Sequence, residues 1–470
     1  MIPPKRVNIN VNVQRLLFSE LFMKSDEFTA TKKSNLKINL EIAFVFALTI
    51  FSFIISMIHL NFPSTRIFDE LYRVTRAELF LHKQVFVVDQ PPFGRYPMIL
   101  GILLFGNNPI GWRISQIISR ALLVPISYFI GKSIFKHKHA GLLMAFFVTF
   151  NLSFLAYSRI GVVVMLEVFL VAISFLLFIL SIKDDTKNGK LLFCLSAVLT
   201  GFTIATKWTA LCLLPIYWLW IKTKTNIKST FPERLPFKIL FLIIVFSAYL
   251  LTFAGEKRNF EYYHQAYGMH NSSFLESVIS WHKLAIGSHT REGVSHPYSS
   301  KWYTWPFMYK PVVLYQDIDK AGKQITSIIG LGNPIVWWLG DLAILFQLFL
   351  LLFKRDKTMV FLLGAYFISF LPYAFIQRPM FLYHYLISLF FQMLILEYTF
   401  ANLYKEKVFL RPALSLLLVL IIFIFFYFYP FINGYPVSTS EYFHRLWFKS
   451  WREFQLVNGS NMFFLNAPHP

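Results

Sequence analysis

The residues best suited to chemistry stand together after the first long apolar segment of the chain. They are the adjacent carboxylates Asp69 and Glu70, which follow Phe68. A carboxylate in a partly desolvated pocket can serve as a general base near neutral pH, because burial raises its pKa. The alternative is a helix cap, since the helix dipole favours acids in the first turn. The pair therefore predicts either a catalytic base or the start of a helix.

A second polar run follows closely, from Asp89 to Arg95, and reads DQPPFGR. Its two prolines stiffen the turn, and Gly94 lets the backbone approach a neighbour closely. Asp89 and Arg95 bracket the run and are predicted to contact a sugar or an acceptor. An ordinary turn is the alternative.

Several cations lie in or beside apolar segments, namely Arg113, Arg120, Arg159, Lys207 and Arg378. Ionisable groups at such depth are costly and usually face a cavity or a partner. Several of them together would suit a lipid phosphate, which arginine can bind with two parallel hydrogen bonds. The alternative is that these long side chains extend to the lipid headgroups at the membrane surface. Glu167 also lies in an apolar segment and is predicted to pair with Arg120 or Arg159.

Aromatic side chains with polar tips gather further along, between His296 and Pro306, in the run HPYSSKWYTWP. Such side chains suit sugar stacking or a belt at the membrane interface. Trp337 and Trp338 follow Gly332-Asn333-Pro334 and are predicted to anchor a membrane span.

The composition requires a membrane. Of the 470 residues 56% are hydrophobic and only 15% are charged, with a net charge of +21. The cations are scattered between apolar runs, which argues against nucleic-acid binding and favours cytoplasmic loops under the positive-inside rule. The two cysteines, Cys194 and Cys212, lie in apolar segments without metal-site spacing.

Apolar runs long enough to span a membrane predict an all-α polytopic protein with about eleven transmembrane helices. The predicted spans cover residues 38–59, 110–131, 139–157, 161–182, 190–206, 209–222, 237–254, 333–353, 358–376, 380–400 and 409–429. A shorter apolar piece, 97–105, is predicted to be re-entrant or interfacial.

The distribution of lysine and arginine places the N-terminal segment, 1–37, in the cytoplasm. That segment lacks the apolar core of a cleavable signal peptide. The transmembrane domain, 38–430, then carries two long outer-face loops, about 60–109 and 255–332, and an outer-face tail, 431–470. The run 71–84 has helical periodicity and is predicted to lie on the outer membrane face.

These residues, taken in order, resemble the protein O-mannosyltransferase family in its short prokaryotic form. The resemblance covers about 65–390 and rests on Phe68-Asp69-Glu70, the 89–95 run, Ser158-Arg159, Lys207-Trp208, His296-Pro297-Tyr298, Gly332-Asn333-Pro334 and Arg378 with His384-Tyr385. Two departures stand out, because Gln90 replaces a histidine of the family and Glu167 lies further from Ser158-Arg159 than the family's acid. The sugar-lectin-like domain of eukaryotic members is absent from the second loop.

The resemblance implies a GT-C fold and a polyprenyl- or dolichyl-phosphate-mannose donor, with Ser or Thr hydroxyls of secreted or membrane proteins as acceptors. It implies Asp69 as base with Glu70 beside it. A single displacement would invert the anomeric configuration. Because phosphate is already a good leaving group and cations are at hand, no metal or other cofactor is expected to be required. The expected donor-phosphate residues are Arg113, Arg159, Lys207 and Arg378. The expected acceptor or sugar contacts are Asp89, Arg95, His296, Tyr298, Trp302, His384 and Tyr385.

Three other interpretations stay open at this point. A related transferase could use the same donor with a lipid or glycan acceptor, a polyprenyl-lipid transporter could use the buried cations as a headgroup path, and an inactive scaffold could keep the fold. The expected location is a prokaryotic plasma membrane, with the active site on its outer face.

Overall fold

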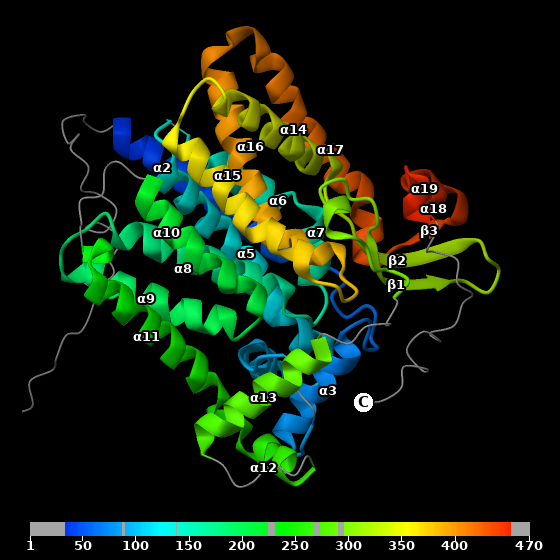
Figure 1. The fold of residues 1–470 in the computed structure, drawn as a ribbon. Coiled ribbons are helices and arrows are strands. Elements are labelled where there is room, and N and C mark those ends of the chain that lie inside the picture. Colours follow the sequence, from blue (N-terminus) through cyan, green and yellow to red (C-terminus); the bar gives the residue numbers. More distant parts are fainter. Residues whose placement is uncertain are drawn as a thin grey trace, which may run out of the picture. The chain divides into compact units, whose positions relative to one another are not determined.

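The computed structural model describes residues 33–86, 90–137, 139–223, 231–266, 273–289 and 296–452. The chain divides into two units, residues 1–44 and 45–470, and the described part of the first is the beginning of α2 (Lys33–Met57). The second unit is mostly helical (Figure 1). The candidate site lies within this second unit.

The helices follow the predicted order closely. All eleven predicted spans coincide with helical segments in the structure. The helices that correspond to them are α2, α5 (Pro109–Ile134), α6 (Leu142–Thr149) with α7 (Leu152–Ser158), α8 (Val164–Ser181), α9 (Lys187–Ile204), α10 (Leu213–Thr223), α11 (Leu235–Leu251), α14 (Pro334–Leu351), α15 (Lys357–Phe370), α16 (Leu386–Glu406) and α17 (Arg411–Asn433).

Eight helical segments in the described residues are long and apolar enough to cross a membrane. They contain α2, α5, α8, α11, α14, α15, α16 and α17. The predicted third span is instead two short helices, because Asn151 leaves the helical backbone and its side chain caps α7 by accepting from Phe154 N. The short apolar piece at 97–105 is helix α4 (Tyr96–Phe105), with ten residues.

The two long loops contact each other. Arg95 forms an ion pair with Glu256, and Phe86 N donates to Asn259 Oδ1 at 3.1 Å. The six crossings expected between these loops stay a prediction.

Besides α4, other shorter helices belong to the loops and the tail. They are α3 (Glu70–Leu81) in the first loop, α12 (Lys257–Ala266) and α13 (Phe274–His289) in the second, and α18 (Thr439–Arg445) after α17, with a last turn, α19 (Lys449–Arg452). The helix expected over 71–84 is thus confirmed as α3, one residue earlier at its start and three shorter at its end. Its position on the membrane face stays a prediction.

A small antiparallel sheet was not predicted from the sequence. Its strands are β1 (Val312–Ile318), β2 (Gln324–Gly330) and β3 (Pro436–Ser438), in the order β1-β2-β3 (Figure 1). Val437 of β3 lies opposite Ile325 of β2. The strand closing the sheet therefore comes from the far end of the chain, beyond α17.

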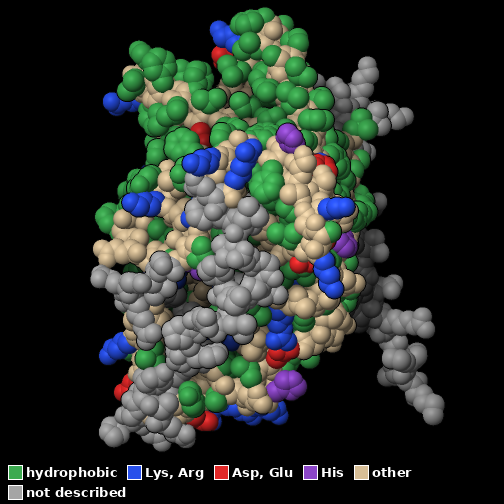
Figure 2. All heavy atoms as spheres, turned by 90° about the vertical axis from the view of Figure 1, so that its right-hand side faces the viewer, with side chains coloured by type: hydrophobic (Ala, Val, Ile, Leu, Met, Phe, Trp, Pro, Cys, Tyr) green, Lys and Arg blue, Asp and Glu red, His purple; other side chains and the backbone are tan. Residues whose placement is uncertain are grey.

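Apolar side chains face outward from the helices that form the rim. In α17, Leu416, Val419 and Phe423 are about 60% exposed, whereas α8 and α16 are buried over most of their length. Figure 2, which is turned by 90° from Figure 1, shows hydrophobic side chains over much of the upper part of the face toward the viewer. Outward-facing apolar side chains of this kind are favourable in lipid and not in water, which fits a multi-pass membrane protein.

Candidate active site

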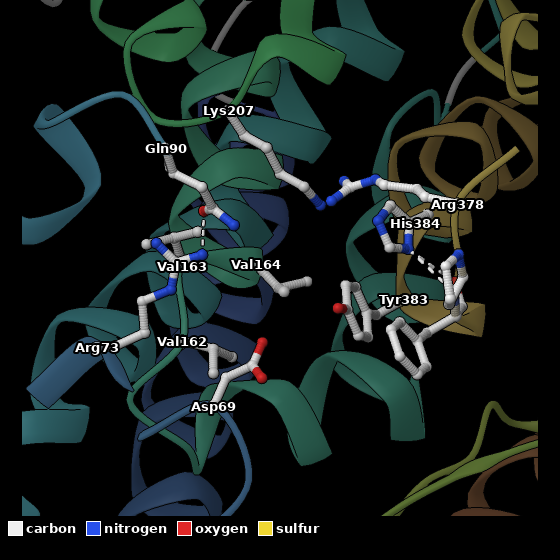
Figure 3. A pocket seen from close by; sticks show the side chains of 12 residues that line it. Asp69, Arg73, Gln90, Val162, Val163, Val164, Lys207, Arg378, Tyr383 and His384 are labelled. Atoms are coloured by element: carbon white, nitrogen blue, oxygen red, sulfur yellow. Dashed lines mark hydrogen bonds between the residues drawn. The ribbon is translucent and has the colours of Figure 1, made fainter. Parts of the chain in front are cut away.

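A pocket opens where several predicted outer connections meet (Figure 3). The space within it, including the part open to solvent, is about 430 Å³. Its walls are Asp69, Arg73, Gln90, Val162, Val163, Val164, Lys207, Arg378, Pro379, Phe381, Tyr383 and His384. These residues come from three predicted outer connections and from the adjoining ends of the predicted spans 161–182 and 380–400.

Asp69 lies on the pocket wall, directly before α3. Its side chain makes no capping hydrogen bond to the helix, and Figure 3 shows its carboxylate directed into the pocket. Asp69 thus stands at the N-terminal cap position of α3, as the alternative predicted, but it does not cap the helix through its side chain. A carboxylate aimed into a pocket is positioned to accept a proton from a bound hydroxyl.

The backbone before Asp69 is held in an unusual conformation. Phe68 has φ of 49°, in the left-handed region that a bulky residue rarely adopts. Glu70 closes this turn from both ends, because its N–H donates to Ile67 O at 2.9 Å while its Oε2 accepts from Ile67 N at 3.1 Å. The Phe68 ring packs edge-on against those of Phe381 and Tyr383. The turn thus fixes the direction in which the Asp69 side chain projects from the backbone.

Glu70 itself is fully buried and is paired with Arg113. Arg113 Nε donates to Glu70 Oε1 at 2.7 Å and Arg113 Nη2 donates to Glu70 Oε2 at 2.9 Å. Gly161 N also donates to Glu70 Oε1, at 2.6 Å. The two adjacent acids therefore differ in role, with Asp69 facing the pocket and Glu70 joining α3, α5 and the segment before α8.

Two of the predicted donor-phosphate residues do not line the pocket. Arg113 is fully buried and also donates to the carbonyl oxygens of Leu60 and Phe62. Arg159 is 1% exposed and donates to the carbonyl oxygens of Ser56, Ile58 and His59. Backbone carbonyls at the end of α2 have no partner within the helix, so these guanidinium groups stabilise the chain after the first span and do not line the pocket.

Lys207 and Arg378, also predicted for the donor phosphate, do line the pocket. Figure 3 shows their charged ends side by side, across the pocket from Asp69. Burial lowers the pKa of Lys207, and the nearby charges of Arg378 and Arg73 lower it further, while Glu167 opposes them. Two cations aimed at one point create a favourable position for an anion.

Arg73 was missed by the sequence analysis. It lies on the pocket wall and donates to the side-chain oxygen of Gln90, as Figure 3 shows. The signal was present, because Arg73 follows Asp69 by four residues and such residues share a helix face. Gln90 stands where the family has histidine and here orients an arginine.

Glu167 has a different partner from those predicted. Its Oε2 lies 3.5 Å from Lys207 Nζ, and its Oε1 accepts a hydrogen bond from Thr209 Oγ1. The hydrogen bonds of Arg120 run instead to Ser52 O, Ser56 Oγ and Thr149 O.

The predicted residues near the tenth span divide into two groups. His384 lines the pocket, and its ring stacks on Tyr383 with centroids 4.5 Å apart. Tyr383 also lines the pocket, with its ring 5.3 Å from Lys207 Nζ. It was not among the predicted residues. Tyr385 points elsewhere, because its hydroxyl donates to Gln392 Oε1 at 2.8 Å in the helix core. Tyr385 is therefore not part of the pocket wall.

The aromatic run of the second loop stands behind the pocket wall. The His296 ring packs edge-on against that of Phe381, 4.9 Å away, and Ser300 N donates to Met380 O at 2.8 Å. Burial lowers the pKa of His296, which favours its neutral form. Tyr298 and Trp302 pack against the same core, and neither lines the pocket.

Arg95 belongs to a second hollow that adjoins the first. It is lined by Arg73, Arg76, Gln90, Pro91, Gly94, Arg95, Met98 and Val163, so the two share three residues. Asp89 lies outside the described residues. Within the described part of the chain, no three His, Cys, Asp or Glu side chains gather as a metal site requires.

Comparisons with known proteins relate the sequence and fold to one family. The family of "C-terminal four TMM region of protein-O-mannosyltransferase" matches residues 274–451, which contain α14 to α17. The family of "Dolichyl-phosphate-mannose-protein mannosyltransferase" matches residues 89–251.

Two mycobacterial relatives agree with these matches. The polyprenol-phosphate-mannose–protein mannosyltransferase of Mycolicibacterium smegmatis is 24% identical over 458 residues, covering 83% of this chain and 88% of the relative. Its namesake from Mycobacterium tuberculosis is 24% identical over 383 residues, covering 68% and 72%.

Solved structures share the fold. The Saccharomyces cerevisiae protein O-mannosyltransferase Pmt1–Pmt2 complex bound to the sugar donor matches with a TM-score of 0.76 at 14% identity, over 93% of this chain and 94% of that chain. ArnT of Cupriavidus metallidurans in the apo state matches with a TM-score of 0.50 at 13% identity, over 78% and 60%. The fold is that of the membrane-embedded GT-C glycosyltransferases. The chain belongs to the protein O-mannosyltransferase family.

Proposed function

We propose that the chain transfers mannose from a polyprenyl-phosphate-mannose donor to Ser or Thr hydroxyls of proteins. The observation that carries this proposal is the pocket, where the Asp69 carboxylate faces the cationic ends of Lys207 and Arg378. A base on one wall and cations on the other match an attacking hydroxyl and a departing phosphate. Membership of the family supplies the substrate class.

The proposed reaction is one in-line displacement at the anomeric carbon of the sugar. The acceptor oxygen attacks while Asp69 takes its proton, and a new carbon–oxygen bond forms. The bond between the anomeric carbon and the phosphate oxygen breaks, and its electron pair leaves with the polyprenyl phosphate. Lys207 and Arg378 stabilise the charge that develops on this leaving group. A single displacement inverts the anomeric configuration.

Residues in and behind the pocket wall orient the groups that react. Glu70, with Arg113, holds the turn from which Asp69 projects. Gln90 holds Arg73 on the pocket wall, and His384 and Tyr383 complete the lining on the side of Arg378. Acceptors would reach Asp69 from the side away from the phosphate, and the hollow around Arg95 and Gly94 adjoins that side. The expected location is the outer face of a prokaryotic plasma membrane.

The test is mannose transfer from a polyprenyl-phosphate-mannose donor to a Ser/Thr-rich peptide by the purified protein. We expect Asp69→Asn to lower the turnover number by about 10²–10⁴-fold, the usual contribution of a general base. Glu78→Gln is the matched control, because Glu78 lies on the same helix, pairs with Arg66 and does not line the pocket.

Three outcomes would change the proposal. Turnover by Asp69→Asn at the wild-type rate removes Asp69 from the role of base. Transfer to a lipid or glycan and not to peptide keeps the reaction and replaces the acceptor. Absence of donor consumption by the wild-type protein in detergent, where no vesicle exists, would contradict a transferase and favour a transporter.

A further inference from the structure

Glu167 is a buried acid that the proposed reaction does not use directly. It lies in the first turn of α8 and is 3% exposed. Its two oxygens reach one short segment between α9 and the next helical turn, since Oε2 lies 3.5 Å from Lys207 Nζ and Oε1 accepts from Thr209 Oγ1. Both oxygens therefore fix a pocket residue or its close neighbour.

The surroundings of Lys207 make this contact important. The ammonium group faces charged or titratable side chains from four other elements, namely Glu167, Arg73, Arg378, Tyr383 and His384. Two of these are arginines, which disfavour a further positive charge nearby. Glu167 is the one carboxylate among these five neighbours, so it is the group that favours the charged form of Lys207.

We propose that Glu167 is a positioning residue that keeps Lys207 protonated and directed into the pocket, so that Lys207 can bind the phosphate of the polyprenyl donor. The inference rests on the proposed function only in assuming that the pocket accepts a polyprenyl phosphate. A purely structural ion pair would affect the stability of the fold, whereas the role proposed for Glu167 predicts an effect on phosphate binding.

Loss of the Glu167 charge should change the pH dependence of phosphate binding in one direction. Burial lowers the pKa of Lys207, and Glu167 raises it through its charge and its hydrogen bond. Removing the negative charge of Glu167 lowers the pKa of Lys207 further, so the lysine loses its proton at a lower pH. Phosphate binding should then weaken at alkaline pH, where the wild-type protein still carries the charge.

The experiment measures binding of undecaprenyl phosphate to the full chain in detergent, by tryptophan fluorescence, from about pH 6 to about pH 10. No sugar transfer is required. We expect Glu167→Gln to shift the alkaline midpoint of binding downward by about one pH unit, which corresponds to about tenfold weaker binding on that limb. Glu167→Asp should recover part of the shift, because it restores the charge at a greater distance.

Two further variants separate this role from a structural one. In Glu167→Gln combined with Lys207→Arg, the alkaline loss should disappear, because arginine stays protonated throughout this range. Glu397→Gln is the matched control, since Glu397 is also a buried acid in a helix but accepts a hydrogen bond from Gly141 N, away from the pocket. Its midpoint should equal that of the wild-type protein.

An alkaline midpoint unchanged in Glu167→Gln would overturn the inference, as would equal shifts in Glu167→Gln and Glu397→Gln. If Glu167→Gln does not fold, Glu167→Asp decides, and an unchanged midpoint there also overturns it. Wild-type protein that does not bind undecaprenyl phosphate contradicts the inference as well. Wild-type protein that binds it with the expected pH dependence, yet transfers no mannose, would contradict only the proposed function.

Discussion

Replacing Arg113 by alanine should cost stability and leave the donor phosphate site intact. In the structure Arg113 Nε and Nη2 donate to the two oxygens of Glu70, at 2.7 and 2.9 Å, and Nη1 donates to Leu60 O at 2.8 Å. Both side chains are fully buried. Arg113→Ala would leave the Glu70 carboxylate without its cation, which typically costs about 3–5 kcal/mol. This is a large fraction of the about 5–15 kcal/mol that stabilises most proteins.

The assay is thermal unfolding of the purified protein in detergent, together with undecaprenyl phosphate binding by the fraction that remains folded. Arg66→Ala is the matched control, because Arg66 pairs with Glu78 near the surface, with side chains 25% and 19% exposed. Pairs of this kind contribute about 0–1 kcal/mol. An Arg113→Ala protein with wild-type unfolding but weaker phosphate binding would refute this reasoning and restore Arg113 to the donor site.

Three further predictions concern the pocket. Burial lowers the pKa of Lys207, so transfer should decline as pH rises through a midpoint below the usual lysine range, and Lys207→Arg should move that decline to higher pH. Gln90→His should keep activity at neutral pH, where a neutral imidazole can still accept from Arg73, and lose it in acid, where the protonated ring repels that arginine; a flat acid limb would contradict this. Gly94→Ala should lower turnover at least tenfold, because its Cβ would lie 2.6 Å from a carbon of the pocket wall, whereas Gly287→Ala, with open space around it, should behave as wild type in the same transfer assay.

Much of the helical framework could be predicted from the sequence, because apolar runs and scattered cations reflect the membrane directly. The place of Asp69 at the start of a helix could also be predicted, because the helical periodicity of the residues after it shows where that helix begins. The broken third span was not predicted, because hydropathy averages over Asn151 and does not register that its side chain caps a new helix.

The roles of the cations could not be predicted in the same way. Arg113, Arg159 and Lys207 look alike in sequence, each being a positive charge near an apolar run. What separates them is the position of their partners, which are backbone carbonyls for Arg159 and a carboxylate with carbonyls for Arg113. These partners come from distant parts of the chain, so only the folded structure reveals which cations remain at the pocket.

The sheet has a consequence for how the protein is made. β2 is synthesised before α14, yet its partner β3 follows α17. Four helices must therefore be inserted into the membrane before β2 can acquire its second neighbour. During that interval the hairpin of β1 and β2 carries an unpaired edge, which is a template for pairing with other chains. Completion of this sheet is thus a late step of biogenesis, at which the two ends of the C-terminal helical region are tied together.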